Sequence, residues 1–153
     1  EQFSAQEKTG FDPSKNTPLY KYSVADETLV EQALTCAKKA QEAWEKTSPV
    51  DKRELFKKIA TEFREGRNDL LGSMIASAGK IFLEADPELS EAIDFIEYYR
   101  KHYEKILTYD DLFYQAKGCI VVTPPWNFPL AIPTGGIAAA LITGNTVIFK
   151  PAP

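Results

Sequence analysis

The sequence predicts an α/β protein in which a helical part, residues 1–117, precedes the first βαβ unit of a Rossmann-like parallel sheet, residues 118–153. The first observation is the distribution of charge and proline: the last 36 of the 153 residues carry one charge, Lys150, and six of the ten prolines. The second is a change of pattern, because apolar residues recur at the helical period only in the first part. The last part instead contains short apolar runs without alternation, as in strands buried on both faces.

The first predicted helix opens at Asp26, and the second opens at Ser48. Asp26 precedes a stripe of apolar residues at helical spacing that ends at Trp44. At the second start, Ser48 is a favourable N-cap, Pro49 occupies the first helical position and Asp51 the third. The stripe of the first helix consists of Leu29, Val30, Ala33, Leu34, Ala37, Ala40 and Trp44.

Two further helices follow before the apolar part begins. Leu55, Ile59 and Phe63 recur every four residues, and we expect this second helix to end near Gly66 or Asn68. A shorter apolar run, residues 70–78, ends at a glycine, as helices often do. The segment 86–88, Asp-Pro-Glu, is typical of a helix N-terminus and predicts that a long amphipathic helix starts there and runs through residue 99.

The last part reads as strand, loop, helix and strand. Residues 119–122 and 146–149 are the predicted strands, and residues 135–142 form an alanine-rich helix that Gly144-Asn145 ends. Residues 123–129 contain three prolines and therefore form a loop. Ligands of open α/β sheets bind at the carboxyl ends of the strands, where this loop and Lys150 both lie. A glycine pair at 135–136 is a weak phosphate-loop signal, and neither common phosphate-binding motif is present.

Composition excludes several classes of function. The net charge of −4 argues against nucleic acid as a partner, and the prolines between residues 124 and 133 interrupt any membrane span. Two cysteines are too few for a disulfide scaffold, so we expect a reducing, cytoplasmic location. His102, the single histidine, lies in a charged stretch and is predicted to be a surface residue. The chain starts at Glu1 without a signal peptide, and we expect it to be cut from a longer protein.

The sequence resembles the aldehyde dehydrogenase superfamily over nearly its whole length, from about residue 11. The most specific segment reads GCIVVTPPWNFPLAIPTGGIAAALITGNTVIFKP, and the helices around residues 33–60 and 78–99 agree with it. Within the superfamily, SEAIDFIEYY and NFPLAIPTG are most similar to glutamate-γ-semialdehyde (1-pyrroline-5-carboxylate) dehydrogenases, including those fused in bifunctional proline-catabolism proteins. The resemblance implies an incomplete aldehyde dehydrogenase fold whose cofactor is NAD, and whose complete protein is a homo-oligomer acting on a small aldehyde.

The resemblance also implies roles for individual residues. Asn127 matches the asparagine whose amide donates to the oxyanion, and its alternative is to satisfy loop backbone. Lys150 matches the lysine that binds the adenosine ribose, and its alternative is a surface lysine. Thr123, Pro124, Pro125 and Trp126 match the loop that lines the cofactor cleft, although Trp126 could instead pack in the core. Where the family often has a ribose-binding glutamate, this chain has Pro153, which leaves NADP open beside NAD.

The family's nucleophilic cysteine and general-base glutamate lie downstream of the matched segment. Cys119 is predicted to be buried in a strand and Cys36 to pack on the first helix, so neither replaces the nucleophile. We therefore expect this chain alone to be inactive, and to be unstable because apolar strand faces lack neighbours. Within the enzyme class the alternative substrates are succinate semialdehyde and betaine aldehyde. The alternative outside it is a non-catalytic homologue that keeps the fold for assembly or nucleotide binding.

Overall fold

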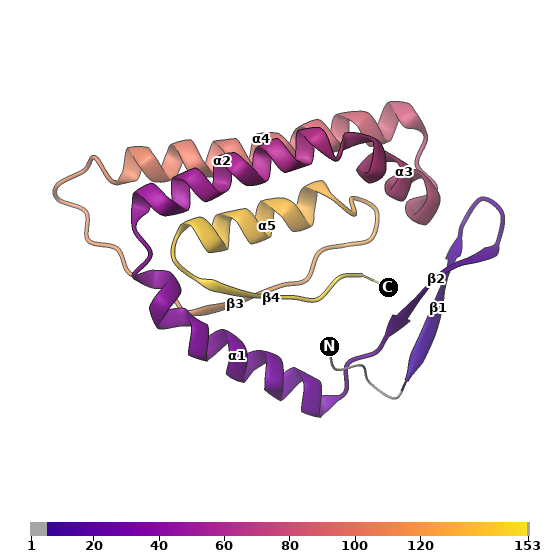
Figure 1. Ribbon diagram of the computed structural model, residues 1–153, viewed down its shortest axis with the longest axis horizontal. Coiled ribbons are helices and arrows are strands. Elements are labelled where there is room, and N and C mark those ends of the chain that lie inside the picture. The colour runs from indigo at the N-terminus through magenta and orange to yellow at the C-terminus, as the bar shows by residue number, and fades with distance from the viewer. Residues whose placement is uncertain (1–5, 153) are drawn as a thin grey trace.

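The computed structural model describes residues 6–152, which form five helices, an antiparallel hairpin and a parallel pair of strands (Figure 1). The hairpin precedes the first helix, and the parallel strands flank the last one. In chain order the elements are β1 (Glu7–Asp12), β2 (Thr17–Ser23), α1 (Glu27–Glu45), α2 (Pro49–Glu65), α3 (Arg67–Ala78), α4 (Phe82–Ile106), β3 (Cys119–Val122), α5 (Ala131–Ile142) and β4 (Thr146–Phe149).

The parallel pair β3–β4 has a helix on each face. Figure 1 shows α5 between this pair and the layer formed by α2 and α4, while α1 covers the other side of the strands. Cys119 lies opposite Thr146 and Val122 opposite Phe149, so the strands run in register from end to end. The mixed α/β architecture predicted from the sequence is confirmed, including the bounds of both parallel strands.

The core lies where α5 meets α2 and α4. Its largest fully buried side chains are Phe56 from α2, Leu89 and Ile96 from α4, and Ile142 from α5. Burying a side chain of this size stabilises the fold by about 1.5–3 kcal/mol. These contacts fix the position of α5, the element that connects the two strands.

The predicted starts of α1 and α2 are confirmed. Oδ1 of Asp26 accepts a hydrogen bond from the backbone N–H of Leu29 at 2.9 Å, and Oγ of Ser48 accepts one from that of Asp51 at 3.1 Å. Each bond satisfies one of the helix's free N–H groups. Gly66 follows the last residue of α2 and Gly79, with φ 66°, follows α3, as predicted for both helix ends.

Two predicted helix starts differ from the structure. α4 begins at Phe82 rather than at Asp86, because the Glu84 carboxylate accepts from the backbone N–H of Ile81 at 3.2 Å and supplies an earlier cap. Pro87 therefore lies in the second turn, where its ring removes one helical hydrogen bond. α5 begins at Ala131, four residues earlier than predicted, with its proline in the first turn, where a missing N–H costs little.

The hairpin β1–β2 was not predicted. Its turn is built by Asp12, whose Oδ1 accepts from the backbone N–H groups of Ser14 at 2.8 Å and Lys15 at 3.2 Å, and by Asn16 at φ 53°. The hydrogen bonds from Ser14 lower the pKa of Asp12. Pro18 within β2 argues against a strand, which explains why the pattern escaped detection.

Candidate functional site

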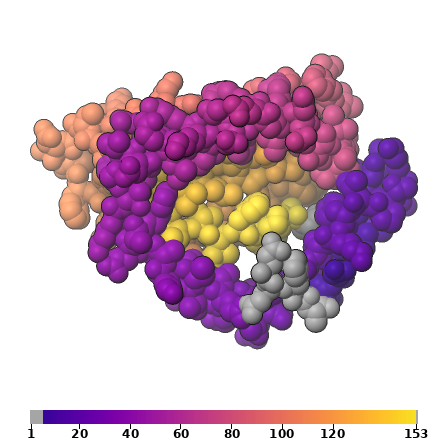
Figure 2. Space-filling model, viewed as in Figure 1, coloured from indigo at the N-terminus to yellow at the C-terminus, as the bar shows by residue number. Residues whose placement is uncertain are grey.

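A cavity of about 230 Å³ opens at the carboxyl ends of β3 and β4. The loop after β3 and the residues after β4 form much of its wall, and α3 and the hairpin close it from the other side. Figure 2 shows the last described residues, in yellow, in a hollow between α1, α2 and the hairpin. The lining residues are Tyr20, Ser77, Ala78, Pro124, Pro125, Trp126, Pro129, Pro133, Phe149, Pro151 and Ala152.

The structure places three predicted loop residues, Pro124, Pro125 and Trp126, directly in the wall of this cavity. Trp126 is 68% exposed, so the alternative that it packs in the core is wrong for residues 6–152. Thr123 and Asn127 flank these residues and are exposed, without lining the cavity themselves. The Asn127 side chain makes no hydrogen bond to residues 6–152, so satisfying loop backbone is not its role within that range.

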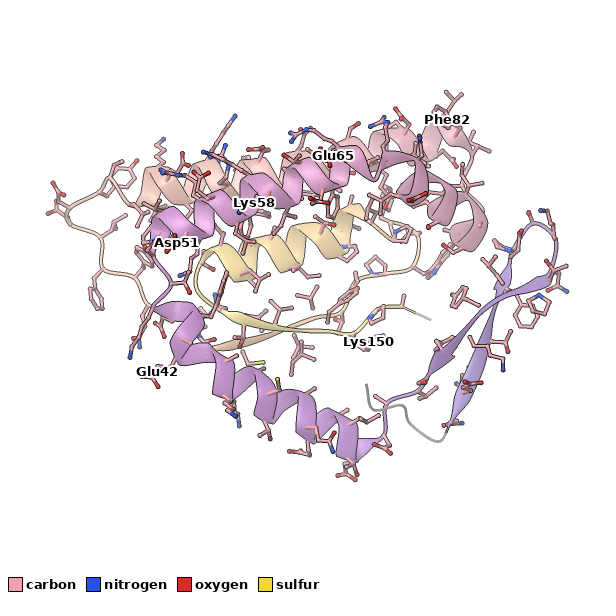
Figure 3. All side chains as sticks on the ribbon, in the orientation of Figure 1. Glu42, Asp51, Lys58, Glu65, Phe82 and Lys150 are labelled. Atoms are coloured by element: carbon pink, nitrogen blue, oxygen red, sulfur yellow. The ribbon has the colours of Figure 1, made fainter. Side chains whose placement is uncertain are left out.

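Lys150 lies at the carboxyl end of β4, one residue beyond the strand. Its backbone N–H donates to the carbonyl of Val122 at 3.0 Å, which extends the parallel ladder, while its side chain is exposed. In Figure 3 Lys150 lies at one end of the sheet, and Glu42 and Asp51 lie toward the other. Within the part of the chain that the structure describes, no carboxylate forms an ion pair with its ammonium. The ammonium is available to a polar ligand group.

The loop between β3 and α5 is held by a charged pair from outside it. The Glu88 carboxylate, on α4, accepts hydrogen bonds through Oε1 from the backbone N–H groups of Leu130 at 2.8 Å and Ala131 at 3.1 Å. Nζ of Lys80 lies 2.7 Å from Oε2 of Glu88, as an ion pair rather than an aligned hydrogen bond. The same Nζ lies 4.4 Å from the centre of the Phe128 ring.

Sequence reasoning did not assign this role to Glu88 or Lys80. Both were interpreted as parts of helix boundaries, whereas the Glu88 side chain is 1% exposed and that of Lys80 is 12% exposed. A signal was present, since Glu88 follows Ala85 by three residues and precedes Ala92 by four, which places a carboxylate on the buried face of α4. A charge on such a face requires a partner.

Polar side chains also fasten the βαβ unit at its other end. Oδ1 of Asn145 accepts from the backbone N–H groups of Lys117 at 2.7 Å and Gly118 at 3.0 Å, so it joins the start of β3 to the end of α5. The Gln41 side chain on α1 accepts from the N–H of Thr146 at 2.8 Å and donates to the carbonyl of Gly144 at 2.8 Å. These bonds hold β4 against α1 and fix the strand that carries Lys150.

The glycine pair serves packing rather than phosphate binding. Both residues lie inside α5, where a Cβ on Gly135 would come within 3.2 Å of the Phe95 ring and one on Gly136 within 3.0 Å of Val122 Cγ1. The two glycines let α5 pass closely between α4 and β3. The weak phosphate-loop signal is therefore not supported by its place in the fold.

Neither cysteine lies in the cavity. Cys36 is exposed on α1, so the expectation that it packs is wrong, and Cys119 is half-buried at the first position of β3, the end opposite the cavity. His102 is exposed, as predicted, and its Nδ1 lies 2.9 Å from the Tyr98 carbonyl oxygen. Residues 6–152 contain no cluster of three or more histidine, cysteine or acidic side chains that could hold a metal. No helix in the same range is long and apolar enough to cross a membrane.

A parallel βαβ unit with a cavity at the carboxyl ends of its strands is the arrangement in which open α/β proteins bind ligands. Comparison with known proteins makes this specific. Residues 3–153 match the aldehyde dehydrogenase family, and the chain belongs to that family.

Several named relatives are 1-pyrroline-5-carboxylate dehydrogenases. The protein from Geobacillus sp. is 36% identical in an alignment 149 residues long, which covers 91% of this chain and 29% of the relative. The bifunctional protein PutA of Salmonella typhimurium is 39% identical over 128 residues, 84% of this chain and 10% of that protein. The chain therefore spans less than a third of the length of these relatives.

Solved structures agree over almost the whole chain. Proline utilization A from Bdellovibrio bacteriovorus superposes with a TM-score of 0.95 at 32% identity, covering 99% of this chain and 17% of that one. A 1-pyrroline-5-carboxylate dehydrogenase from Thermus with bound NAD superposes with a TM-score of 0.90 at 31% identity, covering 98% and 31%. The mixed α/β fold of this chain is thus that of the first part of an aldehyde dehydrogenase.

Proposed function

We propose that these residues are the N-terminal segment of an NAD(P)-dependent aldehyde dehydrogenase that oxidises L-glutamate γ-semialdehyde to glutamate in proline catabolism. The observation that carries the proposal is the 34–39% identity to 1-pyrroline-5-carboxylate dehydrogenases and PutA across most of the chain. A cytoplasmic location and assembly into a homo-oligomer belong to the same proposal. In this proposal the nucleophilic cysteine and the general-base glutamate lie outside these residues. Neither Cys36 nor Cys119 lines the cleft, so neither is placed to act as the nucleophile.

The cleft suits a dinucleotide chemically. Pro124, Pro125 and Trp126 offer an apolar wall for flat rings. Lys150 does not line the cavity itself, but it lies between the lining residues Phe149 and Pro151, and its exposed ammonium can donate to ribose hydroxyl groups. NAD, when bound, supplies the acceptor for the hydride that leaves the substrate carbon. NAD is the proposed cofactor, and NADP is the alternative. The family often has a ribose-binding acid where this chain has Pro153, which lies outside the described residues.

Asn127 is the residue of this chain that would act on the reacting atoms. Its amide N–H is a neutral donor, which can stabilise the negative oxygen that forms when a thiolate attacks an aldehyde. The side chain is exposed next to the cleft wall and free of other described partners, as an oxyanion donor must be before substrate binds. Loss of one such donor lowers kcat by about 10²–10³ in comparable sites.

The fold itself does not select the substrate. A benzaldehyde dehydrogenase from Corynebacterium glutamicum superposes on 97% of this chain with a TM-score of 0.89 at 25% identity. Succinate-semialdehyde and betaine-aldehyde oxidation, and a non-catalytic role in assembly or nucleotide binding, are therefore alternative outcomes of the test.

The test follows NADH formation by the complete polypeptide with 1-pyrroline-5-carboxylate, with NADP, succinate semialdehyde and betaine aldehyde as comparisons. We expect preferential turnover with the first substrate, and a fall of at least about tenfold in kcat for Asn127→Ala. Asn68→Ala is the matched control, since Asn68 is exposed on α3 and away from the cleft lining. Preference for another aldehyde would replace the substrate, and folded protein without any turnover would favour the non-catalytic role.

A further inference from the structure

The negative charge at the start of α5 comes from α4 instead of from a local cap. α1 and α2 are capped by the residue just before each helix, whereas α5 has Leu130 at this position, with no side chain able to accept. Glu88, 42 residues earlier in the chain, accepts from both Leu130 and Ala131 instead. A carboxylate at a helix N-terminus also interacts favourably with the helix dipole.

Lys80 pairs with Glu88 and also contacts the loop. Its ammonium is 2.7 Å from the Glu88 carboxylate and 4.4 Å from the centre of the Phe128 ring. Contacts from the pair therefore reach residues 128, 130 and 131, which lie one, three and four positions after Asn127. Since the Asn127 side chain has no partner in residues 6–152, the backbone that follows it sets the place of its amide.

Stability alone does not account for a buried charge pair here. Replacing such a pair by apolar residues is often neutral or stabilising, because the two charges of the native pair lose their hydration on burial and their mutual attraction does not always repay this cost. A buried carboxylate at 2% exposure does, however, favour one geometry of the loop, since Oε1 accepts from two loop N–H groups while Oε2 faces the Lys80 ammonium. Active-site donors need positions fixed to within a fraction of an ångström.

We infer that Glu88, balanced by Lys80, is a positioning residue that holds the loop 127–131 so that the Asn127 amide stays in place to donate to the oxyanion. The inference rests on the proposed dehydrogenase function. It gives α4, which lies outside the βαβ unit, an indirect role in the reaction: the Glu88 carboxylate holds the loop backbone, and the loop places the Asn127 amide.

A double-mutant cycle in the complete polypeptide tests this inference. Glu88→Gln keeps an oxygen acceptor for the loop N–H groups but removes the charge that faces Lys80, and Lys80→Met keeps the carboxylate but removes the ammonium. We expect each to lower kcat/KM by about tenfold with Asn127 present, and by less than about twofold in the Asn127→Ala background. Non-additivity of this kind is the signature of acting through Asn127.

Glu97→Gln is the matched control. Glu97 also lies on α4 and pairs with Arg100 at 2.7 Å and Arg64 at 3.6 Å, and none of its ion pairs or hydrogen bonds within residues 6–152 reaches the loop. We expect it to leave kcat/KM within about twofold in both backgrounds. If Glu88→Gln lowers kcat/KM by the same factor with and without Asn127, or does not lower it at all, the inference is wrong.

Hydrogen exchange separates this failure from failure of the proposed function. In Glu88→Gln we expect faster amide exchange in the peptide that spans residues 127–131, and no change in α2. An inactive wild type would contradict the proposed function, and with it the expected effect of Glu88→Gln on kcat/KM. Unchanged amide exchange at residues 127–131 in Glu88→Gln would show that Glu88 does not hold the loop. Activity without this exchange difference would overturn the inference alone.

Discussion

Gly136→Ala tests whether the close approach of α5 to β3 is essential to the cleft. An added Cβ would lie 3.0 Å from Val122 Cγ1 and 3.6 Å from Cγ2. Alanine is favoured over glycine in a helix by about 1 kcal/mol, but forcing an extra carbon into a packed interface costs about 1–3 kcal/mol. The net expectation is a loss of up to about 2 kcal/mol of stability.

Gly72→Ala in α3 is the control that measures the helix preference of alanine over glycine without the packing clash. Nothing lies within 4 Å of a Cβ at this position, and the residue is exposed. We expect Gly72→Ala to stabilise the protein by up to about 1 kcal/mol, so the two variants should differ by about 1–3 kcal/mol. The assay is urea unfolding of the complete polypeptide, with the slope of the transition compared between variants.

The same substitution should disturb the site. Val122 is the last residue of β3, its carbonyl accepts from Lys150, and the cleft loop starts one residue later. If Gly136→Ala pushes the strand away, the Michaelis constant for NAD should rise, whereas Gly72→Ala should leave it unchanged. Equal stability of the two variants would refute the packing argument.

Three further predictions concern the rest of the chain. Ser48→Ala should lower the free energy of unfolding by about 1 kcal/mol in urea titrations, because it removes the α2 cap, while the exposed Ser73→Ala should not. Although burial acts to raise it, hydrogen bonds and charge from Arg100 and Arg64 lower the pKa of Glu97 from 4.5. The stabilisation it provides is therefore present above that pH and lost as the pH falls below it, so the stability difference between wild type and Glu97→Gln should shrink in acid; a constant difference would contradict this. Residues 1–153 alone should be inactive and should bind a hydrophobic dye or aggregate on size exclusion, since Val121 is 59% exposed; a cooperatively folding monomer would contradict this.

Most of the βαβ unit could be predicted from the sequence because its signals are local. The strands at 119–122 and 146–149 are unbroken apolar runs, and Gly144, at φ 86°, ends the helix between them as expected. The local sequence also predicted the caps at Asp26 and Ser48, where a side-chain oxygen accepts a hydrogen bond from the backbone N–H three residues later. Patterns of this kind need no knowledge of the tertiary fold.

Features that depend on contacts between distant segments could not be predicted from the sequence. The hairpin needs the pairing of Glu7 with Ser23 and contains a proline that argues against it. α4 begins early because of the Glu84 cap, which competes with the stronger signal at 86–88. The partners of Glu88 lie 42 and 43 residues away, so nothing in the local sequence names them.

The segregation of charge along the chain explains why the cleft depends on α4. The segment 118–153 is apolar because its strands and helix are covered by other elements, and Lys150 is its one charge. A helix N-terminus inside such a segment still needs an acceptor, since its first N–H groups are unpaired and water is excluded. The acceptor must therefore be brought from the charged helical part, and Glu88 with Lys80 is that contribution. The long acidic and basic helices thus do more than solubilise the surface: one of them supplies the charge that holds the loop beside Asn127.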